Sequence, residues 1–442
     1  MMEEEYLSES VRRLLSTEPP QMDQSRMTRF VESCLSYREL FLEIRSKHGT
    51  PLYVVDRRGL ANDAARLRDA FACLPGEVEI YFAVKSNSMP EVSRILIDEG
   101  IGLDVSSGLE LARAVEAGAG SIVFSGPGKR DDELSAAIAN SDRITVLMDS
   151  FGELERLDRL TKSSGIRIRA GVRLSTQPTG LWRKFGIPLE DLPRFWSEAG
   201  HCPFVDLEGI QFHTSWNLTP EAHVSFIDRL GGALAGFPGR ILEDIRFMDL
   251  GGGFWPEQGE WLRAGGTGPG ALRNLLSPEE PDNVSKYMLD SVGIETFASE
   301  IGDSLRKALP DNVECRFYIE PGRWLCHQNM HILMEIVDVK GGDVVITDAG
   351  TNAVGWERFE YDYFPVINLS EPDLTERQCY VLGSLCTPHD VWGYSYFGRS
   401  AAPGDLLLLP LQGAYTFSLR QEFIKPVPET VVVQGPLDLS WY

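Results

Sequence analysis

The sequence predicts an α/β fold, in which a closed (β/α)8 TIM-like barrel is followed by a C-terminal all-β domain. Eight short apolar runs alternate with helix-like segments, a pattern typical of parallel strands joined by helices. The alternation extends over roughly 250 residues, the usual size of such a barrel. After Trp324, strand patterns separated by Gly and Pro turns replace it. An open doubly wound sheet is the alternative that the pattern alone leaves open.

The predicted barrel strands are short runs rich in β-branched and aromatic residues that end at polar or glycine positions. We predict them at 78–86, 102–107, 121–126, 144–150, 167–174, 207–214, 245–253 and 315–323. An entry strand at 51–56 precedes them. Amphipathic helical patterns lie between most of the strands, at 57–71, 90–99, 109–117, 131–139 and 220–235.

Three domains are predicted from these changes in pattern. Residues 1–50 form an N-terminal extension that we expect to pack partly on the β domain, 51–330 form the barrel, and 331–442 form the β domain. A stretch at 254–290, rich in Gly, Pro and Glu, is predicted to be an insertion or lid. Strands of the β domain are predicted at 331–338, 343–348, 378–382, 405–410 and 429–434.

Composition excludes some classes of function. The 42 basic against 65 acidic residues give a net charge of −23, which disfavours binding to nucleic acid or anionic membranes. No apolar run approaches the ~20 residues of a membrane span, and the first residues lack the pattern of a secretory signal. The seven cysteines are scattered and odd in number, which favours reduced thiols. We therefore expect a cytoplasmic protein, and no metal site is predicted.

The predicted strand ends carry the candidate chemistry, because a barrel of this kind functions at the carboxyl ends of its strands. Lys85 ends the first barrel strand. An unpaired ammonium is costly at a buried strand, and a reason to keep one there is a Schiff base with an aldehyde cofactor. The alternative is an ordinary surface lysine.

Other strand ends add groups that suit the same cofactor. Gly251–Gly253 offers backbone amides to an anion such as phosphate, and Arg323 is placed to bind the same group. Glu320 is placed to face a ring nitrogen, and His213 to stack on a flat ring. Singly, these are also consistent with a glycine turn, a surface ion pair and a structural histidine. Together they indicate pyridoxal 5′-phosphate chemistry.

The motifs as a set resemble the fold-type III pyridoxal-phosphate decarboxylases, which include the ornithine, diaminopimelate and arginine decarboxylases. The resemblance covers about residues 50–420, in order. It rests on Tyr81-Phe-Ala-Val-Lys-Ser-Asn, Gly209-Ile-Gln-Phe-His, Asp249-Leu-Gly-Gly-Gly-Phe, Glu320-Pro-Gly-Arg, Cys386 and Gly413-Ala-Tyr.

The resemblance implies a role for each matching residue. Lys85 would form the internal aldimine, His213 would stack on the cofactor ring, and Glu320 would pair with the pyridine nitrogen. Asp104 and Arg173 would be a supporting pair beneath the lysine. The phosphate would be held by Gly251, Gly252, Gly253, Gly322 and Arg323, with Tyr415 beside it.

The resemblance also implies a homodimer with shared active sites. Cys386 of one subunit would enter the site of the other and protonate the substrate α-carbon after CO2 has left. Its loop, which runs from Gly383 to Asp390, has turn residues suited to projecting a side chain. Taken alone, a cysteine in a β domain is more often part of a core.

Two departures from the family pattern bear on the substrate. Decarboxylases of basic amino acids usually have an Asp or Glu after the cysteine, whereas this chain has Thr387, as in specialised biosynthetic members. Trp216 stands where a phosphate-binding serine is common. Arg183, Arg358 and Tyr361 are candidate contacts for the substrate, although an ordinary polar rim explains them equally well.

We therefore expect a decarboxylase of an amino acid or amino-acid-derived intermediate, free or carrier-bound. Three alternatives remain open: a racemase or epimerase on the same barrel, a binding module without activity, and a diaminopimelate decarboxylase proper. The retained Lys85, Glu320 and glycines argue against the inactive module, and the Cys386 motif argues against the racemase.

Overall fold

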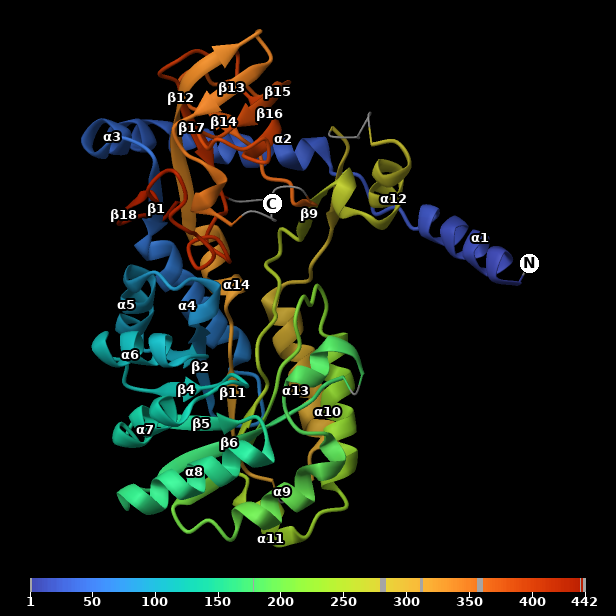
Figure 1. Cartoon of the computed structure of the whole chain (residues 1–442), viewed down its shortest axis with the longest axis vertical. Coiled ribbons are helices and arrows are strands. Elements are labelled where there is room, and N and C mark those ends of the chain that lie inside the picture. Colours follow the sequence, from blue (N-terminus) through green and yellow to red (C-terminus); the bar gives the residue numbers. More distant parts are fainter. Residues whose placement is uncertain are drawn as a thin grey trace. The chain divides into compact units, whose positions relative to one another are not determined.

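The computed structural model describes residues 2–177, 179–278, 284–310, 313–355, 361–437 and 439. They form two compact units (Figure 1). The barrel unit comprises Leu60–Glu257 and Val292–Cys326, and the β unit comprises Met1–Gly59, Gln258–Ser291 and His327–Tyr442. Among the described helices, none combines the length and apolar character needed to cross a membrane.

The barrel unit contains a closed barrel of eight strands in the order β11-β2-β3-β4-β5-β6-β7-β8. Every neighbouring pair is parallel, and β11 closes the ring by pairing with both β2 and β8. This closure confirms the predicted fold class and excludes the open sheet. The strands are β2 Val78–Ala83, β3 Gly102–Val105, β4 Ile122–Phe124, β5 Ile144–Met148, β6 Ile168–Leu174, β7 Val205–Phe212, β8 Phe247–Asp249 and β11 Arg316–Ile319.

Helices lie on the outside of the barrel strands, as Figure 1 shows for α5 to α8. They are α4 Arg57–Phe71, α5 Pro90–Asp98, α6 Gly108–Glu116, α7 Asp131–Ala139, α8 Phe151–Ser164, α9 Leu192–Ala199, α10 Glu221–Leu234, α11 Gly239–Asp244, α13 Ile294–Ala308 and α14 Arg323–Cys326. Short turns of 3-10 helix are η1 Val84–Ser86, η2 Gly180–Lys184 and η3 Leu189–Asp191.

Local sequence explains why these elements begin and end where they do. All five residues of β5 are buried, as expected for a parallel strand covered on both faces. The Ser150 hydroxyl accepts the Glu153 amide and caps the start of α8, and Gly165 ends that helix in the left-handed region at φ 70°. Inside the barrel, a Cβ on Gly209 would lie 2.3 Å from the Phe247 ring, so glycine there makes room for the aromatic core.

The β unit is built on an eight-stranded sheet in the order β13-β15-β16-β14-β17-β12-β1-β18, in which β13 also pairs with β12. The strands are β1 Leu52–Asp56, β12 Met330–Lys340, β13 Val344–Thr347, β14 Ile367–Asn368, β15 Glu376–Leu382, β16 Val391–Phe397, β17 Leu406–Leu409 and β18 Glu429–Val433. The predictions missed β14, which is only two residues long, and β16. The 3-10 turns η5 His327–Asn329 and η6 Thr351–Ala353 also belong to this unit.

N-terminal helices and an inserted segment complete the β unit. They are α1 Met2–Leu15, α2 Gln24–Ser36 and α3 Arg38–His48, and then β9 Glu260–Arg263, η4 Ala264–Gly266, α12 Gly268–Leu276 and β10 Lys286–Leu289. Phe30 of α2 and Phe41 of α3 are fully buried in one core with sheet residues such as Leu333 and Leu408. The inserted strands β9 and β10 pair with each other as an antiparallel hairpin.

The domain boundaries differ from those we placed at 51 and 331. The division falls at Gly59 and His327, and residues 258–291, predicted as part of the barrel domain, belong to the β unit. The physical reason is strand pairing. β1 pairs antiparallel with β12 and parallel with β18, so the predicted entry strand joins the second sheet and not the barrel.

Candidate active site

Lys85 lies in the η1 turn that directly follows β2. Its neighbours Val84 and Ser86 are buried, whereas 37% of the Lys85 side chain is exposed. A Cβ on Gly322 would lie 3.0 Å from Ser86, so the chain after β11 packs directly against this turn. The lysine is therefore fixed at its backbone and accessible at its side chain.

Asp104, at the end of β3, is a carboxylate partner of this lysine. Lys85 Nζ lies 3.4 Å from Asp104 Oδ2, and the Ser125 hydroxyl donates to the other carboxylate oxygen at 2.6 Å. Asp104 is buried and Ser125 follows β4. Three successive strand ends thus position the Lys85 ammonium.

Glu320 follows β11 and is 1% exposed. Its backbone amide donates to the Gly251 carbonyl at 2.7 Å, which joins the ends of β11 and β8. The Gln211 side chain donates to both carboxylate oxygens at 3.4 Å, and His213 Nδ1 lies 3.3 Å from Oε2. These contacts are longer than usual hydrogen bonds, so the carboxylate keeps capacity to accept a stronger donor.

His213 lies between this carboxylate and the glycine turn. The Gly252 amide donates to His213 Nδ1 at 3.2 Å. Burial lowers the pKa of His213 well below its ordinary value, and the Lys85 and Arg173 cations lower it further. The imidazole is therefore neutral at physiological pH, as an aromatic surface against a cofactor ring requires.

The glycine turn is held from behind by a second histidine. His223 Nε2 donates to the Gly252 carbonyl at 3.1 Å, and its ring stacks on Phe254 with centroids 5.1 Å apart. Gly251 and Gly253 have φ of 68° and 85°, a region that favours glycine. The amide of Gly251 donates to Asp249 Oδ1, so that amide and the Gly252 amide are already used.

Buried carboxyl groups give the site its electrostatic character. Burial raises the pKa of Asp104, and Glu320 raises it further, while Lys85 acts in the opposite direction. Burial, and then the neighbouring Glu320, raise the pKa of Asp249 well above its ordinary value. Buried carboxylates that lie close together repel one another, and a cation placed among them relieves this repulsion. The cluster therefore suits an ammonium or a protonated ring nitrogen.

Arg323 begins α14 directly after Gly322. Its guanidinium lies 4.1 Å from the centroid of the Trp255 ring. Trp216 stacks on Trp255 with centroids 6.5 Å apart, and its φ of 57° is strained for a bulky residue. Because the indole of Trp216 is 67% exposed, it covers the surface beside Arg323 without entering the core.

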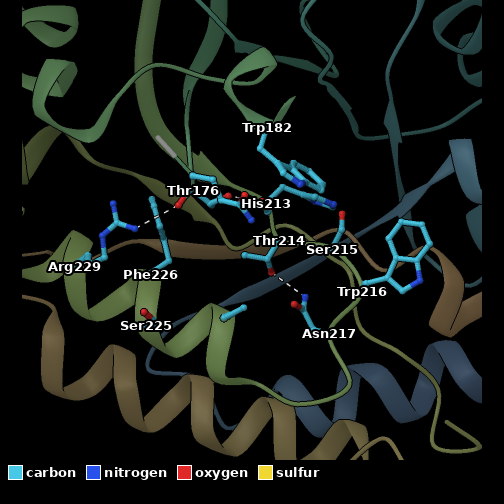
Figure 2. Close-up of a pocket in the computed structure, with 12 residues that line it drawn as sticks. Thr176, Trp182, His213, Thr214, Ser215, Trp216, Asn217, Ser225, Phe226 and Arg229 are labelled. Atoms are coloured by element: carbon cyan, nitrogen blue, oxygen red, sulfur yellow. Dashed lines mark hydrogen bonds between the residues drawn. The ribbon is translucent and has the colours of Figure 1, made fainter. Parts of the chain in front are cut away.

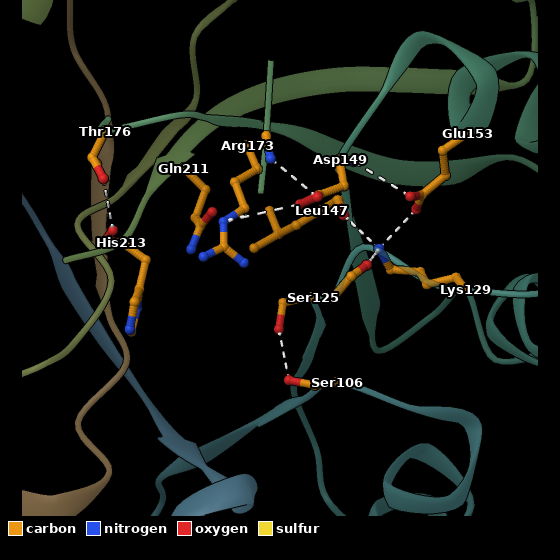
Figure 3. Close-up of polar contacts among 12 residues, drawn as sticks. Ser106, Ser125, Lys129, Leu147, Asp149, Glu153, Arg173, Thr176, Gln211 and His213 are labelled. Carbon is orange, nitrogen blue, oxygen red and sulfur yellow. Dashed lines mark hydrogen bonds and ion pairs between the residues drawn. The ribbon is translucent and has the colours of Figure 1, made fainter. Parts of the chain in front are cut away.

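Asp104 and Arg173, which the resemblance implies as a supporting pair beneath the lysine, contact different residues. Arg173 Nε lies 4.0 Å from Asp149 Oδ1 (Figure 3). Its guanidinium lies 4.6 Å over the Phe185 ring. Asp104 instead contacts Lys85 and Ser125. The reason is the register of the barrel, because Asp149 follows β5, which pairs directly with the β6 strand that carries Arg173.

A cavity of about 450 Å³ opens beside His213 (Figure 2). Its walls include Trp182, Trp216 and Phe226, together with several hydroxyl and amide side chains. Arg229 is the one lining residue with a full charge, and no described lining residue is acidic. Below, we call this space the His213 cavity.

The remaining predicted residues lie elsewhere. Cys386 is exposed in the β unit, in a loop held by the buried Asp390, which accepts the amides of Leu385 and Thr351. The β unit also carries Thr387, Tyr415, which is half-buried with φ 57°, and Tyr361, which is 50% exposed. Arg183 is exposed on η2 of the barrel unit. Arg358 lies outside the described residues.

Sequence reasoning missed several residues that hold the site. Gln211, Ser125 and His223 contact Glu320, Asp104 and the glycine turn, respectively. Gln211 lies on β7, two residues before His213, which directly follows that strand, so period-two alternation was a signal that the two share a face. No local pattern indicated the other two.

Comparison with known proteins assigns the family. The pyridoxal binding domain of the pyridoxal-dependent decarboxylases matches residues 60–327, more than half of the chain. A diaminopimelate decarboxylase from Methanothermobacter thermautotrophicus is 27% identical over 420 residues, which covers 90% of each chain. A 2-[(L-alanin-3-ylcarbamoyl)methyl]-2-hydroxybutanedioate decarboxylase from Staphylococcus aureus is 26% identical, covering 86% of this chain and 93% of the relative.

A solved structure shows the same fold. Diaminopimelate decarboxylase from Helicobacter pylori, complexed with L-lysine, has a TM-score of 0.72 at 22% identity, covering 89% of this chain and 94% of that one. The barrel, the strand-end residues and the family match agree, and the chain belongs to the pyridoxal-dependent decarboxylase family. It is an enzyme of the carboxy-lyase class that decarboxylates an amino acid.

The residues present fit pyridoxal 5′-phosphate. Lys85 is reachable by an aldehyde, and the buried carboxyls near it would suit a protonated ring nitrogen. The Gly253 amide makes no hydrogen bond with any described residue, so it is available to a phosphate oxygen. The long contacts of Glu320 leave its carboxylate free to accept a charged donor.

Proposed function

We propose that this enzyme holds pyridoxal 5′-phosphate on Lys85 and removes the α-carboxylate of an amino acid as CO2. The observation that carries the proposal is the accessible lysine 3.4 Å from the buried Asp104, in a cluster of buried carboxyls. When bound, the cofactor supplies an electron-withdrawing ring that stabilises the charge left at the α-carbon.

The residues of the barrel unit would hold and orient this cofactor. Glu320 would accept a hydrogen bond from the protonated ring nitrogen, and the neutral His213 would lie against the ring. Gly253 would donate its amide to the phosphate, and Arg323 would add charge-assisted hydrogen bonds. Asp104 would hold the Lys85 ammonium in position while the cofactor or the substrate amine exchanges.

Cys386 is the proposed proton donor to the substrate α-carbon. Support comes from its exposure and from the rigidity of its loop, because Asp390 is 2% exposed and accepts three hydrogen bonds from Thr351 and Leu385. We propose that it acts in the site of a second copy of the chain in a homodimer. A Cys386→Ser variant should bind the cofactor normally but release CO2 more slowly or give altered products.

The substrate is proposed to lack an ammonium at its far end. Thr387 cannot pair with a distal amine, and no described residue that lines the His213 cavity is acidic. The Staphylococcus aureus relative is named for a substrate with carboxylate groups at that end. The relatives named diaminopimelate decarboxylase favour a second candidate, diaminopimelate.

Borohydride reduction tests the cofactor assignment. Reduction of the purified protein followed by peptide mass analysis should find the pyridoxyl group on Lys85, and a protein that retains no pyridoxyl group would overturn the proposal. A CO2-release screen over amino acids with acidic, neutral and basic ends then identifies the substrate. Lysine formation from diaminopimelate would support the second candidate, and α-carbon inversion without CO2 would indicate a racemase. Sedimentation tests the homodimer.

A further inference from the structure

Lys129 is a buried cation that takes no part in the chemistry proposed above. It follows β4, and its side chain is fully buried. Nζ donates to Glu153 Oε1 at 2.7 Å and to the carbonyls of Gly126 and Leu147 at 2.7 and 2.8 Å (Figure 3). All three ammonium protons are therefore used. A buried ion pair is weak evidence for stability, so its position in the fold needs another explanation.

The Lys129–Glu153 pair is hydrogen-bonded to Asp149, which contacts α8, Gly186 and Arg173. The Asp149 amide donates to the second Glu153 oxygen at 3.4 Å. One oxygen of the Asp149 carboxylate accepts the Gly186 amide at 3.0 Å, and the other lies 4.0 Å from Arg173 Nε. Asp149 is 5% exposed, so water screens these contacts little.

The segments that Asp149 joins are the two ends of one loop, residues 175–187. The Ile187 amide donates to the Arg173 carbonyl at 2.9 Å, and the Ser175 amide donates to the Ile187 carbonyl at 2.8 Å. At Gly186, with φ 72°, a Cβ would lie 2.7 Å from the Leu174 carbonyl carbon. Only glycine therefore fits where the two ends of the loop approach each other. Arg173 lies between the Asp149 carboxylate and the Phe185 ring.

The same loop forms a wall of the His213 cavity. Thr176, Gln177 and Trp182 line that cavity (Figure 2). The Thr176 hydroxyl donates to the His213 carbonyl at 3.4 Å, and Arg229 donates to the Thr176 carbonyl at 3.3 Å. The position of the two paired ends of the loop, which we call its neck, therefore sets how the loop contacts His213, the residue proposed to lie against the cofactor ring.

We propose that Asp149 is a positioning residue that clamps the neck of the 175–187 loop through Arg173 and Gly186, and that the buried Lys129–Glu153 pair holds Asp149 in place. The clamp keeps Trp182 beside His213 and so shapes the substrate side of the site. The kinetic part of this inference rests on the proposed function, whereas the clamp itself does not.

Trypsin provides a test that needs neither cofactor nor substrate, because Arg183 and Lys184 are exposed within the loop. Asp149→Asn keeps an acceptor for the Gly186 amide and removes the charge that faces Arg173. Asp149→Ala removes both. Trypsin cleavage of the full chain after residue 183 or 184 should be fastest in the alanine variant, about tenfold faster than in the wild type. This is the effect expected when the loop loses one charge-assisted hydrogen bond and opens more often. Asp206→Asn is the matched control, because it removes an ion pair with Arg167 whose side chains are 31% and 60% exposed.

Equal cleavage in the wild type and Asp149→Ala overturns the proposal. Should that variant not fold, Phe185→Leu decides. It removes the half-buried ring that lies beneath the Arg173 guanidinium and also contacts Trp182 and Lys184 of the loop, so it should also speed cleavage. Unchanged cleavage in this variant overturns the clamp. With the substrate found by CO2 release, Asp149→Asn should raise KM several-fold and change kcat little. An unlabelled Lys85 with faster loop cleavage would sink the proposed function and leave the clamp standing.

Discussion

Two lysines follow strands of the same barrel, and each has a carboxylate partner, yet they are built for different purposes. Lys85, after β2, is 37% exposed and lies 3.4 Å from Asp104. Lys129, after β4, is fully buried, with Glu153 and two carbonyls within 2.8 Å. Because all three Lys129 protons are hydrogen-bonded in the interior, its nitrogen is not accessible to an aldehyde. An accessible lysine that is loosely held can lose its proton and react.

The largest expected effect comes from removing Lys85, the accessible lysine of the two. Lys85→Ala should abolish CO2 release to the background of the assay and remove the borohydride label, because no other amine takes its place. The free energy of unfolding should fall less than for a fully buried pair, because the Lys85 side chain is 37% exposed and the Ser125 hydroxyl still donates to the Asp104 carboxylate. Lys162→Ala, which removes a surface pair on α8, is the control that should keep full activity. Normal turnover by Lys85→Ala would contradict the assignment.

The opposite result is expected at Lys129. Lys129→Met leaves Glu153 buried without its partner and should lower the free energy of unfolding by about 3–5 kcal/mol. The double variant Lys129→Met/Glu153→Leu should recover most of that loss, because an apolar pair replaces the ion pair. Urea unfolding measures both. Both folded variants should still label on Lys85, and loss of the label from a folded Lys129 variant would show that the two lysines do not have separate roles.

Glu320→Gln sharpens the comparison by changing the charge around Lys85. The amide cannot hold a ring nitrogen protonated, so kcat should fall by about 10²–10³, the usual cost of removing one preorganised charge contact. The label on Lys85 should persist, because the lysine is untouched. Glu198→Gln, in the surface pair with Arg194, provides the control, and a kcat equal to that of the control would exclude the proposed role of Glu320.

The smallest effect concerns the histidine that is sealed behind the site. Burial lowers the pKa of His223 to about 3, from an ordinary value of 6.5. The folded state therefore binds fewer protons than the unfolded state between these values, and stability present above pH 6.5 is lost as the pH falls. The slope attributable to His223 is about 1.4 kcal/mol per pH unit. Urea unfolding of His223→Gln from pH 6.5 down should show a shallower slope, whereas exposed His201→Gln should match the wild type.

Local sequence predicted the barrel strands well because their signals are local. Each observed barrel strand overlaps a predicted run, and Lys85, Asp104 and His213 each lie at or just beyond a strand end. Parallel strands bury both faces, so their apolar runs are easy to detect. The two-residue β14 has no such run, and in β16 of the β unit Gly393 and Ser395 interrupt the aromatic residues, so both strands were missed.

Sequence reasoning could not settle which side chains contact each other or which strands pair. Arg173 faces Asp149, and no local pattern indicated this contact, because it depends on which strands become neighbours. β1 reads as an ordinary strand, and pairing with β12 and β18, hundreds of residues away in the chain, assigns it to the β unit. The same holds for residues 258–291, whose hairpin belongs to the β unit although it interrupts the barrel in sequence.

By itself, the sequence determined the barrel and placed a lysine where its first strand ends, because periodicity and motif residues are properties of short segments. The tertiary structure alone decided which lysine is open and which is sealed. That distinction comes from desolvation and hydrogen-bond partners, which are supplied by strands and loops that meet only when the barrel closes.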